Sequence, residues 1–215
     1  MVWIRIILGW AGAYLLGSMP TGIFWGWIAR RIDVRKHGSG RTGGTNVWRS
    51  VGFLPALLTA ITDGLKGAAA IWLARSMGLS LAAIALAGVL VIVGHNYSLF
   101  LNFRGGAGTA TTVGLAAALW APFLPILSAA GIVIGVLVGH ASVASIVMAI
   151  LLPLIFVVRG EMFNAALLGI PVMLLTLWAL RPNIQRLRDR AERFLPIYEH
   201  KPPLICLSQH PARRK

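Results

Sequence analysis

The sequence predicts an all-α protein, a polytopic membrane bundle of about seven transmembrane helices with its N-terminus outside and its C-terminus in the cytoplasm. Hydrophobic residues make up 57% of the chain and charged residues only 12%, with a mean hydropathy of +0.77. Soluble domains carry about a quarter charged residues. Apolar runs of membrane-spanning length recur along the chain. Arginine and lysine gather in alternate connections, and the positive-inside rule places those connections in the cytoplasm.

The apolar spans follow one another with short connections. We expect them at residues 3–28, 51–74, 79–93, 109–120, 124–139, 143–158 and 163–180. The fourth and fifth are short, and one bent hairpin or a single long span is an alternative for them. A Gly-Ser-Met-Pro-Thr-Gly segment at 17–22 interrupts the first span, and lipid tolerates such a break only where it faces protein or a wet cavity. Residues 1–194 are predicted to form the membrane domain, and 195–215 a basic, disordered cytoplasmic tail.

The charge pattern excludes some classes of function. The formal net charge is +14, but the basic residues lie between and after apolar runs, which indicates anionic lipid or substrate and not nucleic acid. Cys206 is the only cysteine, so no disulfide can form within the chain, and no cluster of side chains has the spacing of a metal site. Because every long polar loop falls on the cytoplasmic side, the pattern favours a membrane enzyme of the inner leaflet over a transporter.

A glycine-rich loop precedes the fourth span. Gly105, Gly106 and Gly108 follow Arg104, and an apolar run begins at Thr109. Such a loop can aim its N–H groups, together with the positive end of the next helix, at one phosphate. A glycine hinge that only allows close helix packing is an equal alternative.

The first cytoplasmic loop is a second candidate phosphate site. It places Ser39 between two glycines and adds Arg41, Thr45, Asn46 and Arg49. The planar guanidinium group of arginine matches two phosphate oxygens. An ordinary flexible loop is the alternative.

Three ionisable residues fall within or beside the spans. Asp63 and Lys66 are three residues apart, so on a helix they share a face and can pair. The pair either lines a polar cavity or locks helices together. His95 begins the glycine-rich loop, where a structural or a catalytic role is open.

Taken together, these segments resemble the PlsY-type acyl-phosphate–glycerol-3-phosphate acyltransferases of bacterial membranes. The resemblance extends from about residue 14 to 194 and depends on motifs in three loops and two spans. They are Gly38-Ser39-Gly40, Gly43, Thr45-Asn46 and Arg49; Gly94-His95-Asn96, Phe103-Arg104-Gly105-Gly106, Gly108 and Ala110-Thr111; Asn183-Ile184, Arg186-Leu187 and Glu192; and, in the spans, Gly17-Ser18, Pro20, Gly22, Asp63 and Lys66-Gly67.

The resemblance implies a seven-helix enzyme of the bacterial inner (plasma) membrane. Such an enzyme transfers a fatty acyl group from acyl phosphate to the 1-hydroxyl of glycerol 3-phosphate, giving lysophosphatidate, without a cofactor. Its partners are these two substrates, the lipid bilayer and, as a candidate, the soluble enzyme that makes acyl phosphate. By resemblance, Ser39, Arg49 and Asn183 are catalytic, the glycine-rich loop binds glycerol phosphate, and Glu192 holds the third loop in shape.

Three positions depart from the family pattern. Ala107 stands where the family usually has lysine, Leu180 where it has histidine, and Arg41 where it has asparagine. We hypothesise that Arg41 supplies the cation missing at position 107. A non-catalytic relative that binds a phosphorylated lipid precursor and a small anion transporter are the alternative functions.

Overall fold

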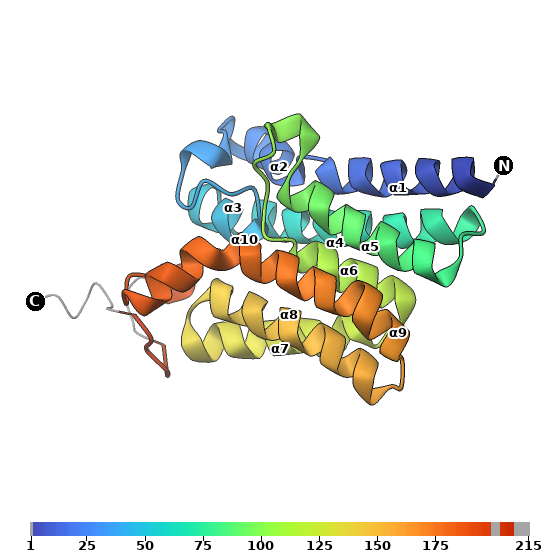
Figure 1. The fold of residues 1–215 in the computed structure, drawn as a ribbon. Helices are drawn as coiled ribbons and strands as arrows, with labels where there is room; N and C mark the ends of the chain where they lie inside the picture. Colours follow the sequence, from blue (N-terminus) through green and yellow to red (C-terminus); the bar gives the residue numbers. More distant parts are fainter. Residues whose placement is uncertain (1, 199–202, 209–215) are drawn as a thin grey trace, which may run out of the picture.

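The computed structural model describes residues 2–198 and 203–208, and within them the chain is helical with no strand. The long helices lie side by side in one bundle (Figure 1). They are α1 (Val2–Ser18), α2 (Thr21–Arg30), α3 (Gly44–Ser50), α4 (Phe53–Ser76), α5 (Leu81–Asn96), α6 (Thr109–Leu119), α7 (Phe123–Val138), α8 (Ala141–Val158) and α10 (Ile170–Arg188). Short turns complete the chain: η1 (Val34–Lys36), η2 (Leu99–Leu101), α9 (Met162–Asn164), the π-helical η3 (Ala165–Gly169) and η4 (Pro196–Tyr198).

The helices confirm the predicted all-α membrane bundle. Among the described residues, five helical segments are long and apolar enough to cross a membrane: Val2–Arg30, Phe53–Ser76, Leu81–Leu101, Ala141–Val158 and Met162–Arg188. Two shorter apolar helices, Thr109–Leu119 and Phe123–Val138, lie between them. The fourth and fifth predicted spans are therefore separate helices.

The break in the first span lies between α1 and α2. Helix α1 ends at Ser18, so the carbonyl groups just before Pro20 have no helical donor. The Ser98 hydroxyl donates to the carbonyl of Ser18 over 2.5 Å, and Nζ of Lys66 donates to that of Met19 over 3.1 Å. The break thus faces protein, as a break at membrane depth requires.

Glycines bring neighbouring helices into close contact. A Cβ atom on Gly94 of α5 would lie 2.2 Å from the carbonyl oxygen of Tyr14 in α1, and one on Gly114 of α6 would lie 1.9 Å from that of Gly64 in α4. Small residues at such crossings are the usual basis of helix packing in membranes. The apolar core continues with large buried side chains, including Phe123, Phe156, Leu127 and Leu152.

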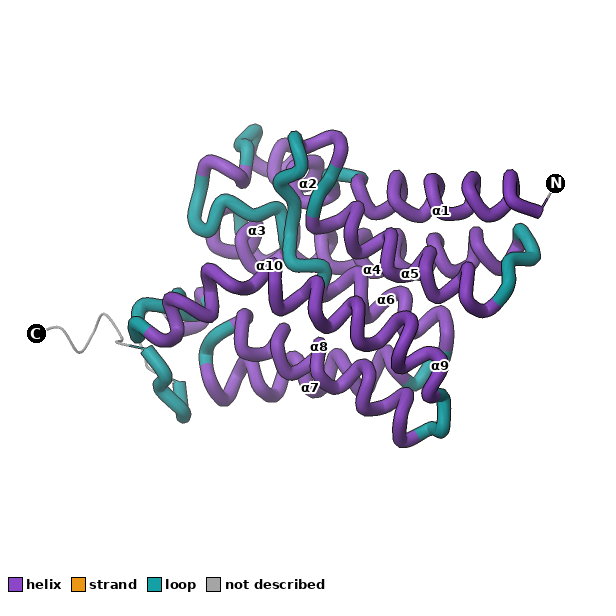
Figure 2. The backbone as a smooth tube through the Cα atoms, in the orientation of Figure 1, coloured by secondary structure: helices purple, strands orange, loops and turns teal. Residues whose placement is uncertain are grey.

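The long polar connections gather at one end of the bundle, on the left in Figure 2, together with the short turn between α7 and α8, and the other short turns lie at the opposite end. Two details differ from the sequence prediction. The first polar loop contains a helix, α3, whose Val47 is fully buried. The last helix continues through Pro182 to Arg188, past the predicted end at Leu180.

Part of the predicted disordered tail lies outside the described residues. Its described part contacts the end of α7: the N–H of Leu195 donates to Gly139 over 2.7 Å, the N–H of Ile205 donates to Leu137 over 2.9 Å, and the Tyr198 hydroxyl donates to the carbonyl of Val136. Residues 199–202 and 209–215 are not described. The domain boundary at residue 194 stays a prediction.

Candidate functional site

Two arginines of the first loop join it to the end of α10. The Nη2 atom of Arg41 donates to the carbonyl of Ala179. Arg49 of α3 donates to the carbonyl of Phe194, from Nε over 3.3 Å and from Nη2 over 3.1 Å. Segments about 140 residues apart in the sequence therefore form one polar region, which includes the predicted catalytic residue Arg49.

Asn46 organises the turn that carries Ser39. Its Nδ2 donates to the carbonyls of Val34, His37 and Arg41 over 2.8–3.1 Å, and its Oδ1 accepts from the N–H of Ser39 over 2.8 Å. The turn has positive φ on both sides of Ser39, 56° and 72°, which only glycine adopts readily. The Ser39 hydroxyl has no partner within the described residues.

This geometry changes the expectation for Asn46. Asn46 was predicted among the phosphate ligands, but both amide hydrogens are already bonded within the loop. Its Oδ1 cannot attract an anion, because oxygen accepts hydrogen bonds and donates none. Asn46 therefore shapes the loop, and its amide hydrogens are occupied there.

Asn183 and Arg186 of α10 share a buried carboxylate. Nδ2 of Asn183 donates to Oε1 of Glu192 over 2.8 Å, and Nε of Arg186 donates to Oε2 over 2.9 Å. Glu192 is 5% exposed. These contacts turn the chain after α10 back onto the helix, which is the arrangement that a loop-holding role requires. The Oδ1 of Asn183 is buried without a partner among the described residues.

The glycine-rich loop packs tightly on the end of α5. The N–H groups of Gly105 and Gly106 donate to the carbonyls of Asn96 and His95, each over 3.1 Å. A Cβ on Gly105 would lie 1.9 Å from the carbonyl oxygen of His95, and one on Gly106 would lie 2.1 Å from Nε2 of the same histidine. These glycines are therefore needed for close packing.

That packing limits which N–H groups of the predicted phosphate cradle are free, and phosphate binding by this loop stays a prediction. The N–H groups of Gly105 and Gly106 are already used, so they are not free to bind phosphate as expected. Within the described part of the chain, the N–H groups of Ala107, Gly108 and Thr109 have no partner. Gly108 has φ of 83° and caps α6, so the free N–H groups lie at the positive end of that helix.

The polar region contains more positively charged groups, among them Arg41, Arg49 and Arg186, than negatively charged ones such as Glu192. Burial lowers the pKa of Arg41, and the neighbouring cation Arg186 lowers it further. Burial also lowers the pKa of Arg49, which Glu192 partly offsets. A bound anion would raise both pKa values again.

Two other predicted phosphate contacts lie apart from these hydrogen bonds. Arg104 is exposed, and Thr45 lies half-buried in the first turn of α3. Both side chains lack a polar partner within the described residues.

An apolar groove between α5 and α10 leads to this region. Its volume is about 730 Å³, and its lining is almost entirely apolar apart from Arg181: Val89, Val93, Pro171, Leu174, Leu175, Leu177 and Trp178. The Arg181 guanidinium stacks on the Trp178 ring at 4.1 Å. Ala179, which accepts from Arg41, lies between these two residues, so the groove adjoins the polar region.

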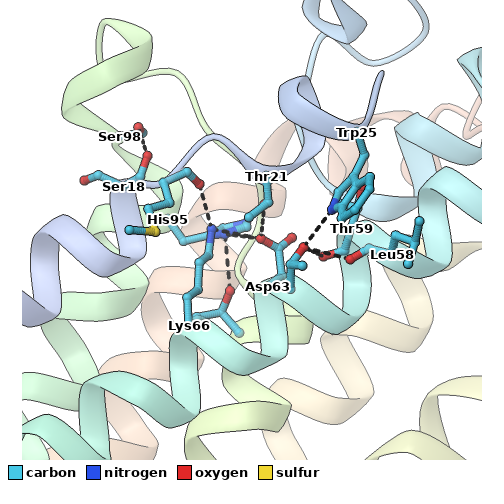
Figure 3. Close-up of polar contacts among 12 residues, drawn as sticks. Ser18, Thr21, Trp25, Leu58, Thr59, Asp63, Lys66, His95 and Ser98 are labelled. Carbon is cyan, nitrogen blue, oxygen red and sulfur yellow. Dashed lines mark hydrogen bonds and ion pairs between the residues drawn. The ribbon is translucent and has the colours of Figure 1, made fainter. Parts of the chain in front are cut away.

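The predicted Asp63–Lys66 pair forms and belongs to a larger buried network (Figure 3). Oδ1 of Asp63 lies 2.8 Å from Nζ of Lys66 and accepts from the Thr21 hydroxyl over 2.5 Å. Nδ1 of His95 lies 3.6 Å from the same oxygen and 3.2 Å from the hydroxyl of Thr111. The network joins α2, α4, α5 and α6 behind the glycine-rich loop, which favours the helix-joining role for the pair.

Sequence reasoning missed one participant, His140 at the turn between α7 and α8. Its Nδ1 lies 3.1 Å from the carbonyl oxygen of Arg193, and its ring stacks on Phe194. His140 lies in the short connection between the fifth and sixth predicted spans, and no local signal links it to residue 193. No group of three or more potential metal ligands occurs among the described residues.

The sequence of this chain is similar to those of known glycerol-3-phosphate acyltransferases. The family profile described as glycerol-3-phosphate acyltransferase matches residues 7–190. A protein of Deinococcus radiodurans named glycerol-3-phosphate acyltransferase 1 is 42% identical over 191 residues, covering 85% of this chain and 92% of that protein. A glycerol-3-phosphate acyltransferase of Thermus thermophilus is 37% identical over 191 residues, with coverage of 85% and 92%.

The fold of this chain is also similar to solved structures of a glycerol 3-phosphate acyltransferase. The crystal structure of PlsY (YgiH), an integral membrane glycerol 3-phosphate acyltransferase, in its glycerol 3-phosphate form has a TM-score of 0.82 and 30% sequence identity. It covers 90% of this chain and 97% of that one. The lysophosphatidic acid form gives a TM-score of 0.78 at 30% identity, with coverage of 88% and 94%.

Proposed function

This chain belongs to the glycerol-3-phosphate acyltransferase family, and on that premise we propose that its acyl donor is acyl phosphate. The chain is a multi-pass membrane acyltransferase of phospholipid synthesis that acts on glycerol 3-phosphate. The observation that carries the donor proposal is the contact between Arg41 and Ala179, because it places a cationic polar region at the end of the apolar groove. An acyl chain fits the groove, and an acyl-linked phosphate fits the cations.

The reaction is a direct transfer. The 1-hydroxyl oxygen of glycerol 3-phosphate attacks the carbonyl carbon of acyl phosphate, and a new C–O ester bond forms. The bond between the carbonyl carbon and the phosphate oxygen breaks, and inorganic phosphate leaves with the proton of the hydroxyl. The products are lysophosphatidate and phosphate. With phosphate as leaving group, the site needs to align the hydroxyl and the carbonyl and to stabilise the oxyanion.

The proposed residue roles follow from the free groups of the site. The hydroxyl of Ser39 and the Oδ1 of Asn183 have no partner among the described residues, so they are available to the glycerol moiety. We assign phosphate binding to Arg41, to Arg49 and to the free N–H groups of Ala107–Thr109. Arg104 and Thr45 remain candidate phosphate contacts, and Glu192 and Asn46 hold the loops.

We place the polar end at the cytoplasmic face of a bacterial inner membrane. Lysine and arginine are concentrated in the connections at that end, which supports the orientation. The soluble enzyme that makes acyl phosphate would then reach the site directly.

The donor is tested with purified protein and labelled glycerol 3-phosphate. Acyl phosphate, acyl-CoA and acyl carrier protein thioester of the same chain length are supplied separately. Labelled lysophosphatidate from acyl phosphate alone is expected. Equal or faster product formation from a thioester would overturn the donor proposal.

A further inference from the structure

The turn between α7 and α8 buries a histidine against the segment that follows α10. His140 has no exposed surface. Its Nδ1 lies 3.1 Å from the carbonyl oxygen of Arg193, and its ring stacks on that of Phe194, with 4.5 Å between centroids and 28° between planes. Next to it, the carbonyl of Gly139 accepts from the N–H of Leu195 over 2.7 Å. The turn therefore holds three consecutive residues of the segment.

Arg49 holds the same segment from α3. Its Nη2 lies 3.4 Å from the carbonyl oxygen of Arg193 and 3.1 Å from that of Phe194. The carbonyl of Arg193 thus accepts from both His140 and Arg49, as the two lone pairs of a carbonyl oxygen allow. The carbonyl of Phe194, the next residue, accepts the two shorter hydrogen bonds of Arg49, so movement of the backbone at Arg193 and Phe194 would displace the guanidinium group.

We propose that His140 is a positioning residue for acyl transfer, which fixes the backbone at Arg193 and Phe194 and through it the guanidinium group of Arg49. The inference rests on the role proposed above for Arg49. It extends to Asn183, because Glu192 immediately precedes the fixed carbonyl and binds Asn183. Misplacement of a reacting or binding group by about 1 Å can lower the rate of an enzyme by about 100-fold.

The contacts of the His140 ring determine which of its two nitrogens carries the proton. A carbonyl only accepts, so Nδ1 carries the proton and Nε2 is the unprotonated nitrogen. Nε2 is buried and has no partner within the described residues. The charged groups that act on the ring are Glu192 and Arg49, and Arg193 contributes its backbone carbonyl. The neutral ring therefore suits its surroundings, and its one donor is used on the segment.

Three substitutions separate the hydrogen bond from the volume of the ring. The amide nitrogen of His140→Asn can replace the Nδ1 donor. The amide of His140→Gln reaches the position of Nε2 instead, and His140→Phe keeps a ring that stacks on Phe194 but has no donor. Each purified variant is assayed for kcat and for KM of glycerol 3-phosphate, and its unfolding temperature is measured in the same detergent.

We expect His140→Asn to keep kcat/KM within about threefold of the wild type, and His140→Gln and His140→Phe to lose about tenfold or more. The unfolding temperature of His140→Phe should stay near that of the wild type. Wild-type kinetics in His140→Phe would overturn the proposal. So would equal rescue by asparagine and glutamine, or losses that follow the unfolding temperature in all three variants.

The outcome stays separate from that of the donor proposal. The series is run with whichever acyl donor the wild-type protein uses. A donor other than acyl phosphate would overturn the proposed function, and the comparison among the three His140 variants would still decide the positioning role.

Discussion

Nζ of Lys66 lies 2.8 Å from Oδ1 of Asp63, one turn earlier on α4, and both side chains are almost completely buried, at 5% and 2% exposure. The ammonium group also donates to the carbonyl of Met19, which the break before Pro20 leaves without a helical partner. The carboxylate accepts from Thr21 at the start of α2. One ion pair therefore bonds polar groups on both sides of the break in the first span.

Removal of one member of this pair should strongly destabilise the protein. Asp63→Ala leaves the ammonium group buried without its anion, and breaking a buried pair in this way costs about 3–5 kcal/mol. Replacing both with apolar residues, as in Asp63→Leu with Lys66→Met, should cost less than the single change. Thermal unfolding in detergent measures both. A single variant as stable as the wild type would contradict this account of the pair.

Gly106→Ala should destabilise the glycine-rich loop. The added Cβ would lie 2.1 Å from Nε2 of His95, and the neighbouring Asp63 and Thr111 restrict that ring. Overpacking of this kind costs about 1–3 kcal/mol. Gly64→Ala is the matched control, because its Cβ would meet only the carbonyl oxygen of Ala110, at an ordinary 3.6 Å. Equal unfolding temperatures for the two variants would show that the close approach is not what requires glycine.

The sequence predicted what depends on local pattern. Hydropathy located the spans, and the i,i+3 spacing found the Asp63–Lys66 pair. The sequence could not show that His95, 32 positions after Asp63, lies beside the Asp63–Lys66 pair, because that contact depends on how α4 and α5 cross. A glycine that binds phosphate and one that allows close packing look the same in sequence. Only the approach of His95 separates the two roles for Gly106.

The third loop shows the same limit. A loop-holding role of Glu192 was expected from family resemblance, but neither the resemblance nor the local pattern named Asn183 and Arg186 as its partners. His140 lies in a connection between two predicted spans, and no pattern there pointed to a partner. Its partner, the carbonyl of Arg193, is a backbone atom that any residue would supply, so no residue type at position 193 could reveal the contact.

Arg41→Ala should weaken binding of the polar substrate. Arg41 is held against Ala179 among other cations, and a hydrogen bond to a charged group contributes about 1.5–3 kcal/mol. KM for glycerol 3-phosphate should therefore rise by about tenfold or more, with Arg41→Lys in between. Arg188→Ala removes one charge from an exposed position at the same end and is the control. Wild-type activity and affinity in Arg41→Ala would remove the hypothesis that Arg41 replaces the missing cation.

The proposed orientation predicts which cysteine can be labelled from which side. Cys206 is exposed near the polar end, so in intact cells a membrane-impermeant maleimide should label it only after the membrane is opened. Ser76, exposed at the last turn of α4, lies at the other end. In a Cys206→Ser background, Ser76→Cys should be labelled without opening. The reverse pattern would invert the topology.

His140 should make the protein less stable in mild acid. Burial lowers its pKa, although the hydrogen bond to Arg193 and the charge of Glu192 oppose this, and Arg49 acts with burial. The unfolded chain then binds a proton near pH 6.5, at which the folded chain does not, so stability is lost as pH falls from that value toward the lower folded pKa. Unfolding temperatures of the wild type and of His140→Asn, which cannot titrate, are compared at pH 7.5 and 5.5. The wild type should lose more on acidification, and an equal loss in both proteins would show that His140 does not contribute to the pH dependence.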